Sequence, residues 1–173
     1  MIAALFCGCS SSQSDDEALG AEPQRALSGT WVVGGIYLDG KLIDVNDAEG
    51  IASIYGNQLI TFDEEGNFSY LNLFLTEGSY SKIFRKDYKM TYLLKSENFF
   101  RYDNDAEEFV EQPFYQGIKT QYIISLLDEN TLAMWVYDES TDTLKDESEP
   151  ILYVRNGSTS SYINKYKTDI NDW

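Results

Sequence analysis

Short runs of β-forming residues, separated by turn-forming residues, follow one another through most of this chain. The run Gly29 to Leu38 is followed by Asp39-Gly40, a strong two-residue signal for a β-hairpin. Gly66 stands where a three-residue hairpin loop needs a left-handed backbone. Almost no helical period separates the runs, so the sequence predicts an all-β domain, built as a sandwich or barrel. The other predicted strands are 41–45, 58–63, 67–75, 78–84, 87–95, 98–103, 117–127, 131–138 and 150–156.

Alternation of apolar and polar residues separates the faces of these strands. Leu132 and Met134 lie on one side of the run 131–138, and Trp135 lies on the other. Both sides of the run 67–75 are apolar, so we expect that strand to be covered on both faces. Candidate cavity-lining residues in a barrel of these strands are Val33, Phe62, Phe68, Tyr70, Phe74, Tyr80, Tyr92, Leu132, Met134 and Tyr153.

One segment near the C-terminus has helical spacing. Tyr162, Tyr166 and Ile170 recur every four residues, behind a stretch rich in Ser and Thr that can supply an N-cap. The apolar stripe is narrow, so we expect a short C-terminal helix that packs on the outside of the sheet.

Composition excludes several functions. The chain has no histidine, which rules out Ser–His and Cys–His nucleophile systems and zinc sites that need imidazole. No pair of its many carboxylates is marked as a catalytic pair, so we expect neither an enzyme nor a cofactor. The formal net charge of −16 repels phosphate backbones, so nucleic acid is not an expected partner. By the same argument the surface as a whole gains nothing from anionic lipid headgroups.

The loop 138–149 has some of the spacing of a calcium loop. Asp138, Ser140, Asp142, Asp146 and Glu149 fall at ligand positions 1, 3, 5, 9 and 12 of an EF-hand loop. The sixth position is threonine, where the sharp turn needs glycine, and strands are predicted on both sides. We therefore expect no specific calcium site and no other metal site.

The N-terminus has the pattern of an export signal. The apolar run Ile2 to Phe6 is far too short to span a membrane, and small residues follow it. Phe6-Cys7-Gly8-Cys9 resembles the lipobox that bacterial lipoprotein signal peptidase processes. The resemblance implies removal of residues 1–8, lipid attachment at Cys9, and a flexible tether over 9–27. The protein is then expected at the cell membrane or cell surface, in contact with the membrane through its lipid anchor only.

The remaining chain, 28–173, resembles the lipocalin-like domains of bacterial lipoproteins. Gly29-Thr30-Trp31 is similar to the Gly-x-Trp signature in the first lipocalin strand, and Ile60 to Phe68 is similar to a hairpin of these domains. Arg155 stands where lipocalins place an arginine over that tryptophan. The resemblance implies an antiparallel up-and-down barrel, closed by Trp31 and Arg155 and followed by a helix.

Two functions stay open at this point. The barrel can bind a small hydrophobic molecule or a component of the cell envelope. Alternatively, it can be a filled barrel that serves as a protein-interaction or assembly module. An open interior favours the first function and a packed interior favours the second. Aromatic residues lie on both faces of the run 98–102. They indicate either an exposed patch that contacts a partner or a place where the barrel and the acidic insertion after it cover each other.

Overall fold

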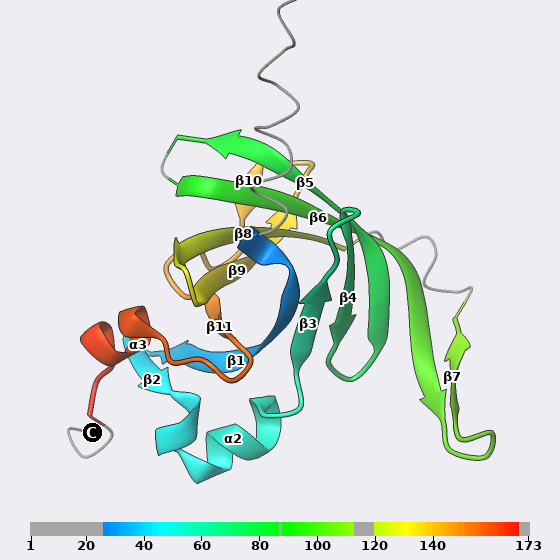
Figure 1. Ribbon diagram of the computed structural model, residues 1–173, viewed down its shortest axis with the longest axis horizontal. Coiled ribbons are helices and arrows are strands. Elements are labelled where there is room, and N and C mark those ends of the chain that lie inside the picture. Colours follow the sequence, from blue (N-terminus) through cyan, green and yellow to red (C-terminus); the bar gives the residue numbers. More distant parts are fainter. Residues whose placement is uncertain (1–25, 87, 113–119, 170–173) are drawn as a thin grey trace, which may run out of the picture.

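The computed structural model describes residues 26–86, 88–112 and 120–169 (Figure 1). Strands account for 56% of the described residues, in one antiparallel sheet of eleven strands. Two short α-helices and one 3₁₀ turn complete the elements of the described part. The prediction of an all-β, antiparallel domain is therefore confirmed.

Eight strands form a closed ring of hydrogen-bonded pairs. From β1 the ring passes through β3, β4, β5, β6, β8, β9 and β11, and β11 pairs with β1 again. The strands are not spaced evenly around a common axis. Their bounds are β1 Gly29–Leu38, β3 Leu59–Phe62, β4 Asn67–Leu71, β5 Leu75–Arg85, β6 Tyr88–Asp103, β8 Gln121–Asp128, β9 Thr131–Asp138 and β11 Ile151–Arg155.

Three further strands pair with members of the ring. β2 (Lys41–Asp44) pairs with the second half of β1, β7 (Glu108–Glu111) pairs with the end of β6, and β10 (Thr143–Leu144) pairs with β9. The last part of β6 and the whole of β7 extend away from the ring as an arm (Figure 1). The 3₁₀ turn η1 (Val45–Asp47) and helix α2 (Glu49–Tyr55) connect β2 to β3.

Turn chemistry explains two of the hairpins. Asp39 and Gly40 both have positive φ, at 49° and 75°, as a type I′ turn requires, and they join β1 to β2. Gly66 has φ 96° in the β3–β4 connection, where Asp63 accepts hydrogen bonds from the backbone N–H groups of Glu65 and Asn67. The predicted positions of both turns are confirmed.

Two hydrophobic clusters lie on opposite faces of the sheet. The interior cluster lies inside the ring and includes Trp31, Phe62, Tyr92 and Tyr153. The outer cluster includes Trp135, Leu152 and Ile163, the last of these from helix α3 (Ser161–Tyr166). β9 alternates between them, because Leu132 and Met134 belong to the interior cluster while Ala133 and Trp135 belong to the outer one.

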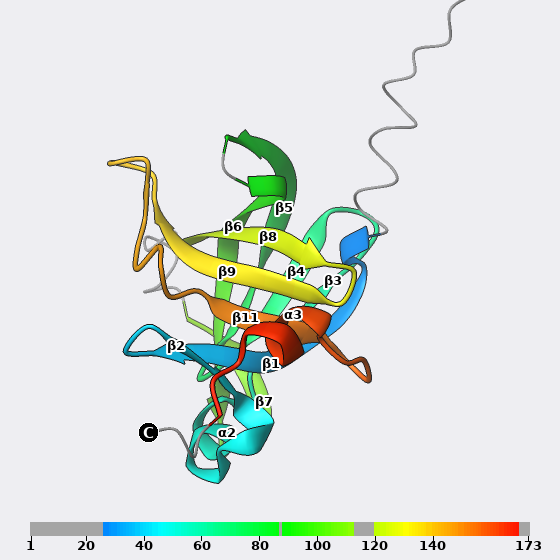
Figure 2. The same ribbon diagram turned by 90° about the vertical axis from the view of Figure 1, so that its left-hand side faces the viewer.

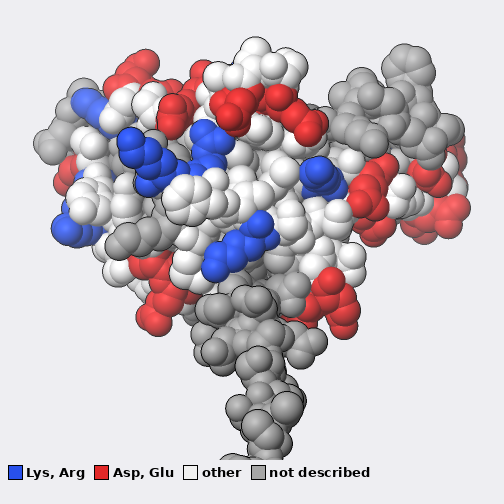
Figure 3. All heavy atoms as spheres, turned by 90° about the horizontal axis from the view of Figure 1, so that it is seen from above, with Lys and Arg blue, Asp and Glu red and all other residues white. Residues whose placement is uncertain are grey.

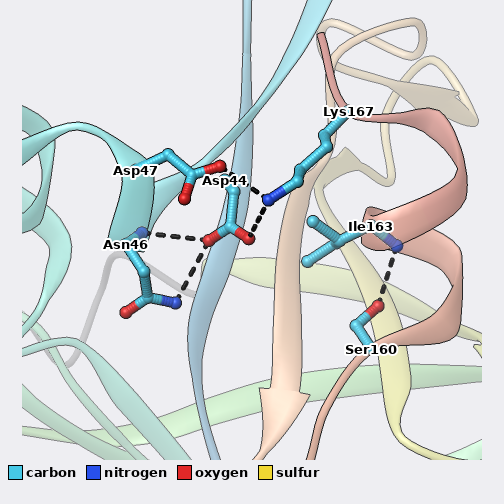
Figure 4. A network of polar contacts seen from close by, with 6 residues as sticks. All are labelled: Asp44, Asn46, Asp47, Ser160, Ile163 and Lys167. Carbon is cyan, nitrogen blue, oxygen red and sulfur yellow. Dashed lines mark hydrogen bonds and ion pairs between the residues drawn. The ribbon is translucent and has the colours of Figure 1, made fainter. Parts of the chain in front are cut away.

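Helix α3 is fixed to the outside of the sheet, beside β2 and the end of β8 (Figure 2). Its N-cap residue, Ser160, accepts a hydrogen bond from the backbone N–H of Ile163, and Ile163 is 2% exposed. Beyond the helix, Lys167 Nζ lies 3.2 Å from Asp44 Oδ2 and 2.6 Å from Asp47 Oδ2 (Figure 4). This network ties the chain after α3 to the β2–η1 corner. The predicted external C-terminal helix is confirmed, but its predicted apolar stripe was wrong in part: Ile163 carries the packing, Tyr166 is 52% exposed, and Ile170 lies outside the described residues.

Several predicted boundaries were wrong. The run 67–75 is not one strand, because β4 ends at Leu71 and β5 begins at Leu75. Between them Asn72 accepts a hydrogen bond from the backbone N–H of Phe74, which forms a turn and leaves Leu73 89% exposed. The runs 87–95 and 98–103 are one strand, β6, with a register shift near Glu97. Helix α2 and strands β7 and β10 were not predicted.

Candidate functional site

Trp31 and Arg155 lie against each other at the C-terminal end of β11. They face each other in the β1–β11 ladder, and the Arg155 guanidinium carbon lies 4.3 Å from the centre of the Trp31 ring. The Trp31 indole N–H donates to the carbonyl of Leu27 at 2.8 Å, and Trp31 is fully buried. Arg155 donates to the carbonyls of Ala26 and Ser28, at 2.7 Å each. The pair thus holds the segment that enters β1 across this end of the strand.

Aromatic rings fill the interior of the ring of strands. Phe62 and Tyr80 meet edge to face at 5.2 Å, and Tyr80 meets Tyr92 at 6.1 Å in a similar geometry. Phe68 lies 6.5 Å from Phe62. These four side chains are between 1% and 7% exposed. This part of the interior is packed like an ordinary protein core.

A pocket of about 310 Å³ lies at the other end of β11, where the strand begins at Ile151. Its apolar lining includes Tyr70 from β4, Tyr122 from β8 and Met134 from β9. Tyr70 and Tyr122 meet edge to face at 5.7 Å. A volume of this size is at the lower end of the range for small-molecule sites. The remaining lining residues are Asn72, Trp135, Val136, Lys145, Asp146 and Glu149.

A chain of hydrogen bonds leads from the core to this pocket through the hydroxyl of Tyr70. Tyr153 donates to Tyr70 and Tyr70 donates to the side-chain carbonyl of Gln58, both at 3.2 Å. Burial raises the pKa of Tyr122 to about 12 and raises the pKa of Tyr153 well above its ordinary value. Neither phenol therefore ionises near neutral pH. Tyr122, which lines the pocket, offers a ligand a hydrogen bond and aromatic surface rather than a base or nucleophile, whereas Tyr153 is fully buried behind the lining.

Polar groups on the segment between β9 and β11 form the rim. Lys145, Asp146 and Glu149 are exposed there. Glu149 Oε1 accepts a hydrogen bond from the backbone N–H of Gly40 at 3.0 Å, and the Trp135 indole N–H donates to the carbonyl of Glu147 at 3.0 Å. These contacts hold the segment in place, so that the pocket has an apolar floor and a charged edge. A more open groove of about 760 Å³ adjoins it and shares Val136 and Lys145.

The structure brings most of the sequence-derived site residues together. Trp31 and nine of the ten candidate cavity-lining residues belong to the interior cluster. Only Tyr70 and Met134 among them also line the pocket. Phe74 is the exception: it lies half-buried in the β4–β5 connection, outside that cluster, because the turn at Asn72 ends β4 first. Cys9 and the tether lie outside the described residues.

The acidic loop 138–149 uses several of its oxygens within the fold. Asp138 accepts from the backbone N–H and hydroxyl of Ser140. Asp142 accepts from the hydroxyl of Tyr137 at 2.8 Å and lies 3.6 Å from Arg85. β10 interrupts the loop, and strands β9 and β11 flank it. In the part of the chain that the structure describes, no group of three or more acidic or cysteine side chains is arranged to hold a metal ion.

Sequence reasoning missed Tyr122, Ile151 and the charged rim. Tyr122 precedes Ile123 and Ile124, which face opposite sides of the sheet, so both faces of β8 are apolar and alternation does not reveal the inner one. The rim depends on long-range contacts such as the Gly40–Glu149 hydrogen bond. The usable signal was the run of three aromatic or aliphatic inner positions, Tyr122, Ile124 and Leu126, two residues apart.

Comparison of the sequence with protein-family models, with curated proteins and with solved structures found no match. Within the described ranges, no helix has the length and apolar character needed to cross a membrane.

Proposed function

We propose that this protein is an exported, lipid-anchored binding protein that holds a small amphipathic molecule in the pocket between Tyr70, Tyr122, Met134 and Ile151. The observation that supports this most is the position of the pocket. It lies at the end of β11 opposite to the Trp31–Arg155 pair, above an interior that is otherwise packed. In this proposal the ring of eight strands is an up-and-down barrel of the lipocalin type, with one closed end and one end that receives the ligand.

The lining of the pocket supports a specific kind of ligand. Tyr70 and Tyr122 offer aromatic faces and Met134 a polarisable thioether, all suited to a flat apolar body. Lys145 and Asn72 at the edge suit a polar or anionic end group, although Asp146 and Glu149 stand beside them. The bound molecule is therefore aromatic or alicyclic, with one polar end that remains near the surface.

The proposed address follows from the N-terminal sequence. Gly8-Cys9, preceded by the apolar residues Ile2 to Phe6, is similar to a lipoprotein processing site. Ala26, the first described residue, is seventeen positions after Cys9. A chain of that length spans at most about 60 Å. Acylation of Cys9 would therefore keep the pocket close to the membrane surface.

A second function is supported by the packed interior and the exposed β6–β7 arm. Tyr102, Phe109 and Val110 are 45%, 40% and 38% exposed on this arm, and the rings of Tyr102 and Phe109 meet edge to face at 5.3 Å. Contiguous exposed apolar groups of this kind are typical of protein contacts. In this alternative the domain is an interaction module with a filled barrel and no small ligand.

A larger side chain in the pocket should weaken ligand binding strongly without disturbing the packing of the core. Replacing the half-buried Ile151 with Trp adds a ring at the pocket lining, and we expect this to weaken binding of the amphipathic dye 1-anilinonaphthalene-8-sulfonate at least about ten-fold. Fluorescence titration of the native protein measures the affinity and the stoichiometry. The wild type should bind one equivalent.

The matched control is Ile54→Trp. Ile54 is 66% exposed on α2 and does not line the pocket, so the same change there should leave the dye affinity unaltered. The pocket proposal would be wrong if Ile151→Trp bound the dye like the wild type, or if both variants lost binding equally. The interaction-module alternative predicts no saturable dye site in any of the three proteins.

A further inference from the structure

The tip of the β5–β6 hairpin carries the most exposed large apolar side chain among those that the structure describes. Phe84 is 92% exposed, and Met90, in the first residues of β6, is 40% exposed. In both ribbon views this hairpin ends on the side of the domain opposite to α2 (Figures 1 and 2). An isolated aromatic ring held almost wholly in water contributes nothing to the core.

The backbone places Phe84 outside the ladder. Ile83 pairs with Thr91 and Arg85 pairs with Tyr88, so the register shifts at Phe84, as in a β-bulge. Met90, on the opposite strand, has φ 47°, a left-handed conformation that is unfavourable for a methionine. The strained backbone at Met90 therefore lies opposite the exposed Phe84, and both side chains extend into solvent.

Basic residues lie close to Phe84 in the sequence, with Asp87 among them, in a chain that is otherwise strongly acidic. Four of the thirteen lysines and arginines fall within eight positions, at Lys82, Arg85, Lys86 and Lys89, although the formal net charge is −16. Lys82 and Lys86 are exposed, whereas Arg85 is paired with Asp142 at 3.6 Å. Seen from above, lysines and arginines are spread across this face and carboxylates lie toward its edges (Figure 3).

We infer that the β5–β6 tip is a second membrane contact, in which Phe84 inserts into the interface of an anionic lipid surface and Lys82 and Lys86 meet the headgroups. An apolar ring flanked by cations combines the two interactions that hold peripheral proteins on such surfaces. The net charge of −16 predicts no attraction to anionic headgroups for the surface as a whole. Attraction acts only within a Debye length of about 10 Å, so the local cluster of lysines can still bind them. The inference does not depend on acylation of Cys9 or on the pocket.

Local charge favours a lipid surface over a protein partner. A protein groove needs a broad apolar contact area, but among residues 82–86 and 90 the exposed apolar side chains are Phe84 and Met90 alone. A lipid interface needs only one inserted ring and cations around it. Leu73, at the β4–β5 turn, is also highly exposed, but the sequence from 59 to 81 contains no lysine or arginine. Leu73 therefore has no cations beside it in the sequence that could bind lipid headgroups.

Vesicle co-sedimentation of the full chain tests the inference, with Cys9→Ser in every protein so that no acyl chain contributes. The parent should bind vesicles of mixed phosphatidylcholine and phosphatidylglycerol and should bind phosphatidylcholine vesicles far less. Phe84→Ser should lower the partition coefficient about ten-fold. Lys82→Gln and Lys86→Gln should each lower it about five-fold, and added salt should reduce the lysine effects.

Leu73→Ser is the matched control, because it also removes an exposed apolar side chain from a turn of the same domain. It should leave the partition coefficient unchanged. Failure of the parent to bind anionic vesicles would overturn the inference, and would leave a protein as the partner of Phe84. Equal losses for Phe84→Ser and Leu73→Ser would overturn it as well, since binding would then not be specific to the tip.

Discussion

Replacing Trp31 with Ala is expected to lower the free energy of unfolding by about 3–5 kcal/mol. Trp31 is fully buried in the interior cluster, so its removal leaves a cavity among well-packed rings. The change also removes the hydrogen-bond donor of the Leu27 carbonyl and the ring under the Arg155 guanidinium. Urea denaturation followed by circular dichroism measures the loss.

Two companion variants separate these contributions. Trp31→Phe keeps an aromatic ring but loses the indole N–H, so it should cost less than Trp31→Ala. Phe84→Ala removes an exposed ring and should change the free energy of unfolding by no more than about 0.5 kcal/mol. A loss below about 1.5 kcal/mol for Trp31→Ala would contradict the proposed role of Trp31, which is to close the ring at the C-terminal end of β11.

Replacing Cys9 with Ser is expected to move the protein from the salt-resistant membrane fraction of its host cells to the soluble and salt-released fractions. Two or three acyl chains on one residue anchor a protein firmly, at about 0.8 kcal/mol for each buried methylene group, and the serine variant carries none of them. Mass spectrometry of the wild-type protein from cells should find a chain that begins at Cys9, without residues 1–8, and that carries the mass of two or three acyl chains on Cys9. Cell fractionation measures the distribution.

Cys7→Ser is the matched control for this prediction. Phe6 precedes Cys7, whereas the small residue Gly8 precedes Cys9, so only Cys9 has the neighbour that a lipoprotein processing site needs. Cys7→Ser should therefore remain in the membrane fraction with its acyl mass intact. An unprocessed N-terminus beginning at Met1 in cell-derived protein would rule out the proposed anchor.

Local turn chemistry explains why part of the fold was predictable. The bounds of β1 (Gly29–Leu38) and β9 (Thr131–Asp138) agree with the sequence prediction because strong turn signals follow or precede these strands. Helix α2 was missed because its seven residues hold only one repeat of the helical apolar spacing, Ile51 and Tyr55, which pack against the interior cluster. β10 was missed because two residues give no period, and only pairing with Tyr137 and Asp138 defines it.

The pocket was less predictable than the strands. Tyr70, Tyr122 and Ile151 come from three segments far apart in the sequence, and their proximity depends on the order of strands in the ring. Periodicity places a residue on a face but does not say whether rings from other strands fill the space in front of it. Phe74 illustrates a second cause of error, because the hydrogen bond from its own N–H to Asn72 removes it from the strand.

The central claim is that the pocket at the start of β11 holds a small molecule, and identification of the natural occupant tests it most directly. Full-length acylated protein would be purified from its host membranes, denatured, and examined by mass spectrometry for small molecules released from the wild type and from Ile151→Trp. The proposed function predicts one amphipathic species, near one equivalent for the wild type and depleted at least about ten-fold for Ile151→Trp. Release of no such species from the wild type, or of equal amounts from both proteins, would contradict it.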